Sequence, residues 1–146
     1  ASKKFDREST IMLNTNIGKD TADLTYVNQV SGIALYDMDV QAINEKLLKC
    51  KAEMLLSNPC FEIWLLLHAK YQKTAIDTDA LIKELKKSAP VWKNYSKSAF
   101  TDTQKTFLNN NTDVAVARAK KLHEFQNPST GIYKLIDFMK EKCKSL

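Results

Sequence analysis

The stretch Gly32-Ile-Ala-Leu-Tyr-Asp-Met-Asp39 sets the fold class, because a compact apolar run ends abruptly here in two acidic residues. An apolar run with acids at its end is typical of a buried parallel strand. Residues 41–50 follow with Ile43, Leu47 and Leu48 at helical spacing, and they predict an amphipathic helix. A second apolar run, Met54-Leu-Leu56, comes next. Strand, helix and strand in this order predict a βαβ unit with a right-handed crossover.

Two weaker elements precede this unit. Thr10-Ile-Met-Leu-Asn14 is typical of a short strand, and residues 20–30 predict a helix between a capping Asp20 and a terminating Gly32. These patterns together predict an α/β part over residues 10–58, with a short, largely parallel sheet and flanking helices.

The remainder of the chain, residues 59–146, predicts a helical part. The nearly all-apolar string Cys60-Phe-Glu-Ile-Trp-Leu-Leu-Leu-His68 indicates a buried central helix. Asn58 is suited to cap this helix, and Pro59 suits its first position, where no amide donor is needed. The side chains expected to be buried in this helix are Trp64, Leu65 and Leu67.

An amphipathic helix is predicted next, over residues 77–87, where Asp77 or Thr78 is the cap and Pro90 follows the end. Residues 91–111 are polar and rich in Asn and Ser, so they predict irregular structure with a short helix near 102–108. In the helix predicted over residues 77–87, the side chains expected to face inward are Leu81, Ile82 and Leu85.

Two more helices are predicted towards the C-terminus. Thr112 is expected to cap a helix that runs to about Phe125, and Asn127-Pro-Ser-Thr130 is expected to cap the last helix, through Cys143. The side chains expected on the inner faces of these helices are Val116, Ala119, Leu122, Ile132, Leu135, Ile136 and Met139.

Length and composition are those of one globular domain over residues 1–146. The longest apolar run, Ile63 to Leu67, is far shorter than the roughly 20 residues of a membrane helix. Three widely spaced cysteines, without a CxxC or Cys/His pairing, argue against a disulfide framework and a zinc site. We therefore expect a cytoplasmic protein without a membrane partner. Three glycines cannot form a phosphate-cradling loop of the usual kind.

Asp37 and Asp39 are the first candidate site, because ligands of open α/β sheets bind at the carboxyl edge of the strands. Paired carboxylates there suit Mg²⁺ or Mn²⁺, which prefer oxygen ligands. The alternative is structural: Asp39 caps the helix that begins near Gln41, and Asp37 is a solvated strand end.

Ser57 and Asn58 end the next strand, so their side chains are expected at the same edge, where they could contact a phosphate or simply cap a helix. Glu62 lies early in the apolar helix, where a carboxylate is costly to bury without a partner. It is therefore a candidate to orient the loop or to reach the metal. His68 is expected to have a structural role, and His123 to lie at the surface.

The formal net charge is +5, from 22 basic and 17 acidic residues. This excess is compatible with nucleic acid but does not prove it. Lysines in residues 83–87, 93–97 and 118–121 could form a phosphate-binding surface if they converge, and Lys83 and Lys87 are the candidates we select. The alternative is that these lysines only solvate helix faces.

The string Ser57-Asn-Pro-Cys-Phe-Glu-Ile-Trp-Leu-Leu-Leu-His68 resembles the signature of the RloB-like family. That family also has an Asp-x-Asp after a strand and an Asn-Pro-Ser-Thr helix start, which match Asp37-Met-Asp39 and Asn127-Pro-Ser-Thr130. The basic helix Leu81-Ile-Lys-Glu-Leu-Lys-Lys87 lies between them, and the resemblance covers roughly residues 32–142.

This resemblance implies a Toprim-like fold, the metal-binding α/β core shared by topoisomerases, primases and some nucleases. RloB-like proteins are bacterial, and the resemblance implies a role in phage defence or abortive infection together with an ABC-type ATPase partner. It also implies Mg²⁺-dependent cleavage of DNA or tRNA in the complete protein, by an N-terminal Glu together with the Asp-x-Asp, here Asp37 and Asp39 as the metal ligands. With Glu62, selected from its position in the apolar helix, these two acids are the catalytic candidates.

The family's early Cys-Glu-Gly-x-x-Thr-Glu stretch has no equivalent here, since Glu8 is followed by Ser-Thr. We therefore expect the family's first strand and its Glu to be missing, either because the sequence is a fragment or because it is a degenerate member. Two functions remain open: a nucleic-acid-cleaving module, and a non-catalytic module that docks on an ATPase.

Overall fold

A computed structural model describes residues 10–13, 32–39, 41, 44–49 and 53–144 of the chain. The helix predicted over residues 20–30, and Glu8, lie outside these residues. The strands are β1 (Thr10–Leu13), β2 (Gly32–Asp37), β3 (Glu53–Asn58) and β4 (Ser129–Thr130). The helices are α2 (Asn44–Leu48), α3 (Glu62–Ala69), α4 (Thr78–Ser88), the 3-10 helix η3 (Pro90–Trp92), α5 (Asp102–Lys120) and α6 (Tyr133–Lys144).

The four strands form one sheet in the order β1-β2-β3-β4. β1 and β2 are parallel, β2 and β3 are parallel, and β4 runs antiparallel to β3. The predicted α/β fold with a short, largely parallel sheet is therefore confirmed. Asp37 pairs with Ser57 across β2 and β3, and Ser57 pairs with Thr130 across β3 and β4. These three residues form one row at the end of the sheet.

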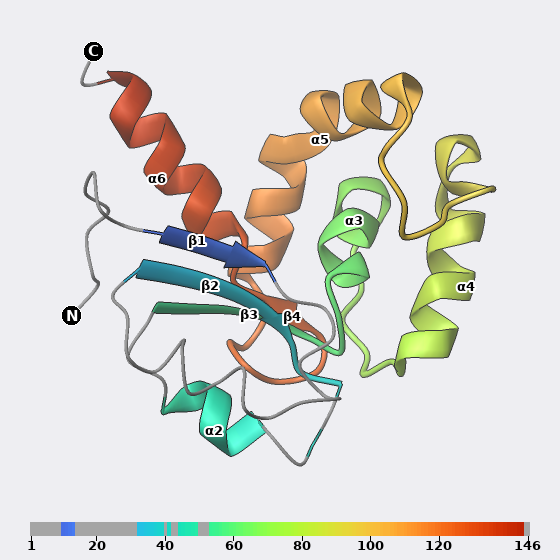
Figure 1. The fold of residues 1–146 in the computed structure, drawn as a ribbon. Coiled ribbons are helices and arrows are strands. Elements are labelled where there is room, and N and C mark those ends of the chain that lie inside the picture. The colour runs from blue at the N-terminus through green and yellow to red at the C-terminus, as the bar shows by residue number, and fades with distance from the viewer. Residues whose placement is uncertain (1–9, 14–31, 40, 42–43, 50–52, 145–146) are drawn as a thin grey trace.

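The helices lie on both sides of the sheet: α2 on one side, and α3, α5 and α6 on the other (Figure 1). α3 is the centre of the core and packs against α4 and α5. Its apolar side chains leave no polar face for solvent, so neighbours must cover the helix all round. Trp64, Leu65 and Leu67 are buried, as predicted. No helix in the described part of the chain is long and apolar enough to span a membrane.

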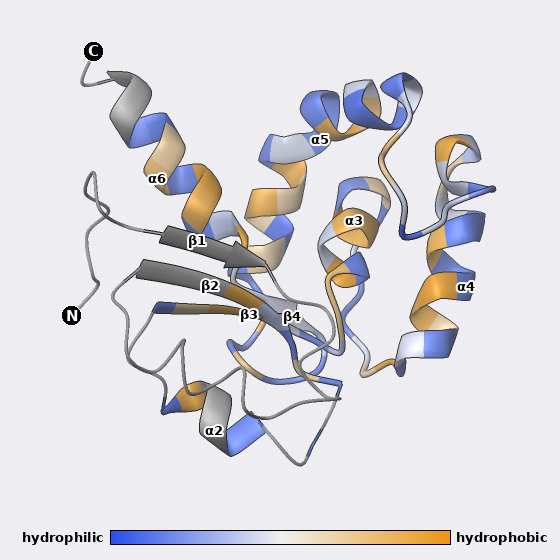
Figure 2. Cartoon of the chain, viewed as in Figure 1, coloured by the Kyte–Doolittle hydropathy of each residue, from blue (hydrophilic) through white to orange (hydrophobic). Residues whose placement is uncertain are grey.

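α4 confirms the predicted amphipathic helix, and Figure 2 shows its hydrophobic and hydrophilic faces. The side chain of Asp77 accepts a hydrogen bond from the N–H of Ala80 and so caps the helix. Leu81 and Leu85 are buried against α3, whereas Lys83 and Lys87 are exposed. The lysines therefore lie on the solvent face of this helix.

The prediction for residues 91–125 is wrong in dividing the helix at Thr112 and in extending it to Phe125, because α5 is one continuous helix of 19 residues that ends at Lys120. Thr101 and Gln104 form a capping box at its start, a signal that the sequence interpretation missed. The polar middle stays helical because Asn111 and Thr112 donate their side-chain hydrogen bonds to carbonyls four residues earlier. Such bonds often bend helices, and Figure 1 shows α5 curved along its length.

The prediction that Asn127-Pro-Ser-Thr130 caps the last helix is also wrong, because Ser129–Thr130 forms β4. Its backbone pairs with the end of β3, and α6 begins only at Tyr133. Two side chains predicted to face inward are exposed: Met139 on α6, at 54%, and Leu48 on α2, at 48%.

The predicted start of the central helix needs a correction as well. Asn58 does not cap α3, because it is still part of β3 and pairs with Ser129. The N-cap of α3 is Phe61, so Pro59 precedes the helix instead of opening it. The alternative that Asp39 caps a helix near Gln41 is not tested, because residues 40, 42 and 43 lie outside the described residues.

Candidate functional site

Asp37 is the last residue of β2, and its side chain reaches the start of α3. Its Oδ1 accepts a hydrogen bond of 2.8 Å from the N–H of Phe61. Phe61 is the N-cap of α3 and has no side-chain oxygen with which to cap the helix itself. Asp37 therefore caps α3 from a neighbouring strand, where the helix dipole favours negative charge. No local sequence pattern predicts this contact, since 24 positions separate the two residues.

The backbone after Asp37 is held firmly. The N–H of Met38 donates to the carbonyl of Ser57 at 2.8 Å, and Asn44 Nδ2 donates to the carbonyl of Met38 at 3.0 Å. Met38 is buried, whereas Asp39 is exposed. The two acids of the Asp-x-Asp thus emerge from a fixed backbone, with Asp37 partly buried and Asp39 in solvent.

Glu62 brings a second carboxylate towards Asp37. It is only 2% exposed, and its Oε2 accepts a hydrogen bond of 2.6 Å from the hydroxyl of Tyr95. Its Oε1 is buried and has no hydrogen-bond partner among the described residues. A buried carboxylate oxygen without a donor is energetically costly, so Oε1 of Glu62 is free to accept a further hydrogen bond or to contact a cation at this corner.

The electrostatics of the corner act mainly on Asp37. Its pKa is raised from the usual 3.8 to about 7, first by burial and then by the negative charges of Glu62 and Asp39. The N–H of Phe61 and the charge of Lys97 lower the pKa of Asp37 in part. The folded protein therefore holds a proton on Asp37 at pH values where a free aspartate has lost it.

Asp39 lies towards α4. Its Oδ2 accepts a hydrogen bond of 3.2 Å from the hydroxyl of Thr78 at the start of that helix. Thr78 and Lys83 also line an open hollow of about 490 Å³. The structure thus brings Lys83 to the Asp39 side of the site, while Lys87 lies about one turn further along the solvent face of α4.

Ser57 lies beside Asp37 in the sheet, but its hydroxyl is buried and occupied. Ser57 Oγ and Thr130 Oγ1 are 2.8 Å apart and share a hydrogen bond, and Thr130 Oγ1 also accepts from the N–H of Ile132. Asn58, the next residue of the strand, points to the other face of the sheet, where its Nδ2 donates to the carbonyl of Phe125. Of these two predicted residues, the structure therefore brings only Ser57 to the face that carries Asp37.

Two side chains that could in principle react, the Cys60 thiol and the His68 imidazole, have structural roles. Burial raises the pKa of the Cys60 thiol, and Glu62 acts in the same direction, so Cys60 is a protonated, poor nucleophile. His68 is buried, its Nδ1 lies 2.8 Å from the carbonyl of Trp64, and burial lowers its pKa. The predicted structural role of His68 fits these contacts, and His123 is exposed, as expected.

The donors at this corner fit a weakly held Mg²⁺ or Mn²⁺. Such ions often bind through one or two carboxylates and complete their shell with water and substrate phosphate. Asp37 and Asp39 are suitable donors, and the mutual repulsion that raises the pKa of Asp37 would be relieved by a cation. Within the described residues, no three His, Cys, Asp or Glu side chains are grouped closely enough to form a closed metal site.

Comparison with known proteins gives one family. The model described as "RloB-like protein" matches residues 12–139, a range that includes the Asp37 corner and most of the helical half. No curated protein and no solved structure matches the chain.

Proposed function

The chain belongs to the RloB-like protein family, and we propose that it is a Toprim-type module that cleaves DNA or tRNA in bacterial phage defence or abortive infection. The observation that carries this proposal is the pair Asp37 and Asp39 at the carboxyl end of β2, in a sheet where β2 and β3 are parallel. This is the edge at which open α/β sheets bind their ligands.

In this proposal Asp37 and Asp39 hold Mg²⁺ or Mn²⁺. The ion would supply stabilisation of the negative charge on the phosphoryl group being transferred. Asp37 must lose its proton to act as a ligand, so the raised pKa makes metal and proton compete for the same carboxylate. Glu62, fixed by Tyr95, keeps the corner negative and thereby favours a cation.

The same proposal gives α4 a role in binding the nucleic acid. Lys83 and Lys87 are exposed on its outer face, and Lys83 lines the hollow that Thr78 shares. Thr78 donates to Asp39, so the start of α4 lies beside the acidic corner, and the hollow there is also lined by Asp77 and Asp79. A phosphate backbone along α4 would therefore lead towards the Asp37 site.

Incubation of the purified protein with duplex DNA and with total tRNA tests the proposal, in Mg²⁺, in Mn²⁺ and in EDTA. We expect cleavage of one substrate that requires the metal and is lost in Asp37→Asn. The matched control is Asp113→Asn, the same change on a surface carboxylate of α5 that pairs with Lys140. Cleavage that survives in Asp37→Asn, or no cleavage by the natural sequence in any condition, would reject the proposal.

A second candidate function is a non-catalytic module that docks on an ABC-type ATPase. The supporting observation is that each acid already has a structural partner: Asp37 caps α3, Asp39 accepts from Thr78, and Glu62 accepts from Tyr95. Co-expression with the ATPase tests it, since co-elution that is unchanged in Asp37→Asn, without cleavage of either substrate, supports docking alone.

A further inference from the structure

The loop between η3 and α5 is anchored at both of its ends. Trp92 is fully buried, and its ring packs against those of Tyr95 and Phe100, with centroids 5.8 Å and 6.1 Å away. A third contact joins Trp92 to Phe107 of α5, with centroids 6.0 Å apart. Aromatic packing at these distances is favourable, so the loop has a defined position on the core.

A hydrogen bond ties the middle of this loop to the candidate site. The hydroxyl of Tyr95 donates to Glu62 in the first turn of α3. Asp37 accepts from the N–H of Phe61, the residue directly before Glu62. Tyr95 and Asp37 are thus attached to consecutive residues of the same helix start, and the loop passes close to the Asp37 corner.

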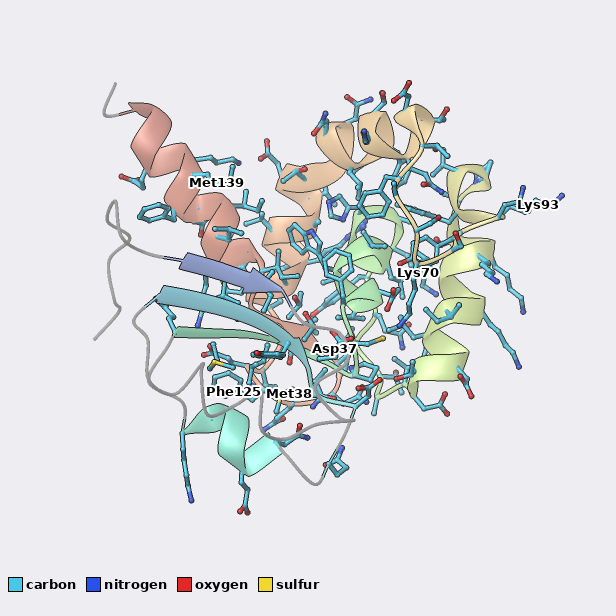
Figure 3. All side chains as sticks on the ribbon, in the orientation of Figure 1. Asp37, Met38, Lys70, Lys93, Phe125 and Met139 are labelled. Atoms are coloured by element: carbon cyan, nitrogen blue, oxygen red, sulfur yellow. The ribbon has the colours of Figure 1, made fainter. Side chains whose placement is uncertain are left out.

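Lys97 lies two residues after Tyr95, at a bend of this loop. Ser96 Oγ and Ser98 Oγ are 2.7 Å apart and hydrogen-bonded, so the two residues that flank the lysine are held together. Lys97 is exposed and forms no ion pair with any described residue. Its backbone is two residues from Tyr95, whose hydroxyl bonds to Glu62 beside the Asp37 corner. Lys93, in contrast, projects from the edge of the molecule, away from Asp37 (Figure 3).

We propose that Lys97 is a phosphate-binding residue of this site, which contacts a phosphodiester of the nucleic acid next to Asp37. The inference rests on the proposed function. A corner that carries Asp37, Asp39 and Glu62 repels phosphate, so the substrate needs a positive group at that point. Lys97 supplies this charge from an anchored backbone, and its ammonium is a strong donor to phosphate oxygens.

Binding of fluorescein-labelled total tRNA and of a fluorescein-labelled DNA duplex tests this role. Fluorescence anisotropy in EDTA over a series of KCl concentrations measures binding without cleavage. We expect Lys97→Ala to weaken binding of the preferred probe about tenfold. The slope of log K against log salt should fall by roughly 0.7 to 0.9, the contribution of one phosphate. Lys97→Arg should restore both quantities because it keeps the charge.

The matched control is Lys93→Ala, the same charge change in the same loop, and it should leave the salt slope unchanged. Equal losses of affinity and salt slope in Lys93→Ala and Lys97→Ala, or no loss of either in Lys97→Ala, would overturn the role of Lys97. The proposed cleavage would be unaffected by this result. If the natural sequence binds neither probe, the role of Lys97 and the proposed function both fail. A loss of slope confined to Lys97→Ala, without cleavage in Mg²⁺, would support Lys97 and reject only the catalytic step. Thermal melts of both variants check that these exposed substitutions leave the fold intact.

Discussion

The substitution Asp37→Asn should stabilise the protein at neutral and alkaline pH. Asn keeps an Oδ1 that can accept the hydrogen bond from Phe61, so the cap of α3 is retained. It removes the negative charge that burial and the neighbours Glu62 and Asp39 disfavour. The change therefore separates the charge of Asp37 from its role as a cap.

The pH dependence follows from the raised pKa. Below about pH 4, Asp37 is protonated in both the folded and the unfolded chain, and its charge does not affect stability. As the pH rises from 3.8 to about 7, the unfolded chain releases this proton while the folded chain keeps it, so the free energy of unfolding falls. Above that range both states are ionised, and the loss is complete.

The size of the stabilisation follows from the difference between the pKa values of Asp37 in the unfolded and the folded chain. A shift from 3.8 to about 7 corresponds to about 4 kcal/mol, since one pKa unit is roughly 1.4 kcal/mol. Asp37 is only partly buried, and solvent screening reduces this figure, so we expect about 2 to 4 kcal/mol. The free energy of unfolding of Asp37→Asn should equal that of the natural sequence at about pH 4 and exceed it by this amount at about pH 8.

Urea unfolding at a series of pH values, followed by the fluorescence of the buried Trp64 and Trp92, measures the difference. Asp113→Asn is the control. The surface carboxyl of Asp113 pairs with Lys140, which lowers the pKa of Asp113, so the effect of this carboxyl on stability as the pH rises is opposite to that of Asp37. No stabilisation near neutral pH is expected for that variant. Parallel stability profiles of Asp37→Asn and the natural sequence would refute the reasoning.

Three further outcomes are expected. Tyr95→Phe leaves the buried Glu62 carboxylate without its donor and should cost about 2 to 3 kcal/mol in urea unfolding; a smaller cost when Glu62→Met is added would confirm the cause. Thr101→Ala removes the capping box of α5 and should cost about 1 kcal/mol in the same assay, and an unchanged stability would contradict the cap. In calorimetric titration with Mg²⁺ and Mn²⁺, Asp37→Ala should abolish binding, whereas Asp39→Ala should weaken it at a stability cost below about 0.5 kcal/mol because the side chain is exposed. Undiminished affinity in Asp37→Ala would mean that the metal binds elsewhere.

The elements that sequence reasoning predicted well depend on local patterns. The apolar run that ends at Asp37 forms β2, with Tyr36 buried, and Ile63 to Leu67 in the string around Trp64 are buried. Asp77 caps α4 as expected, since the residues involved are neighbours along the chain. These features follow from periodicity and capping, which act over one or two turns.

The contacts that shape the site are long-range, and the sequence carries no signal for them. Tyr95 reaches Glu62 across 33 positions, and Ser57 reaches Thr130 across 73. The middle of α5 differs from the prediction for another reason: a stretch rich in Asn and Ser predicts irregular structure, and Thr112 predicts the start of a new helix. In the structure, Thr112 instead bonds within the helix to the carbonyl of Leu108.

The position of β4 has a consequence for the order in which the protein forms during synthesis. β2 and β3 leave the ribosome well before β4, because Thr130, the hydrogen-bond partner of the Ser57 hydroxyl, is 73 positions further along the chain. Until then the end of β3, at Ser57 and Asn58, lacks its partner strand on the outer edge, and such an edge can pair with other chains. A nascent chain that stops before Ser129 already contains both acids of the Asp-x-Asp but lacks the strand that closes the sheet beside them. The Asp37 corner is therefore completed only when translation has passed α5, so a truncated product carries the acids without the support of the completed sheet.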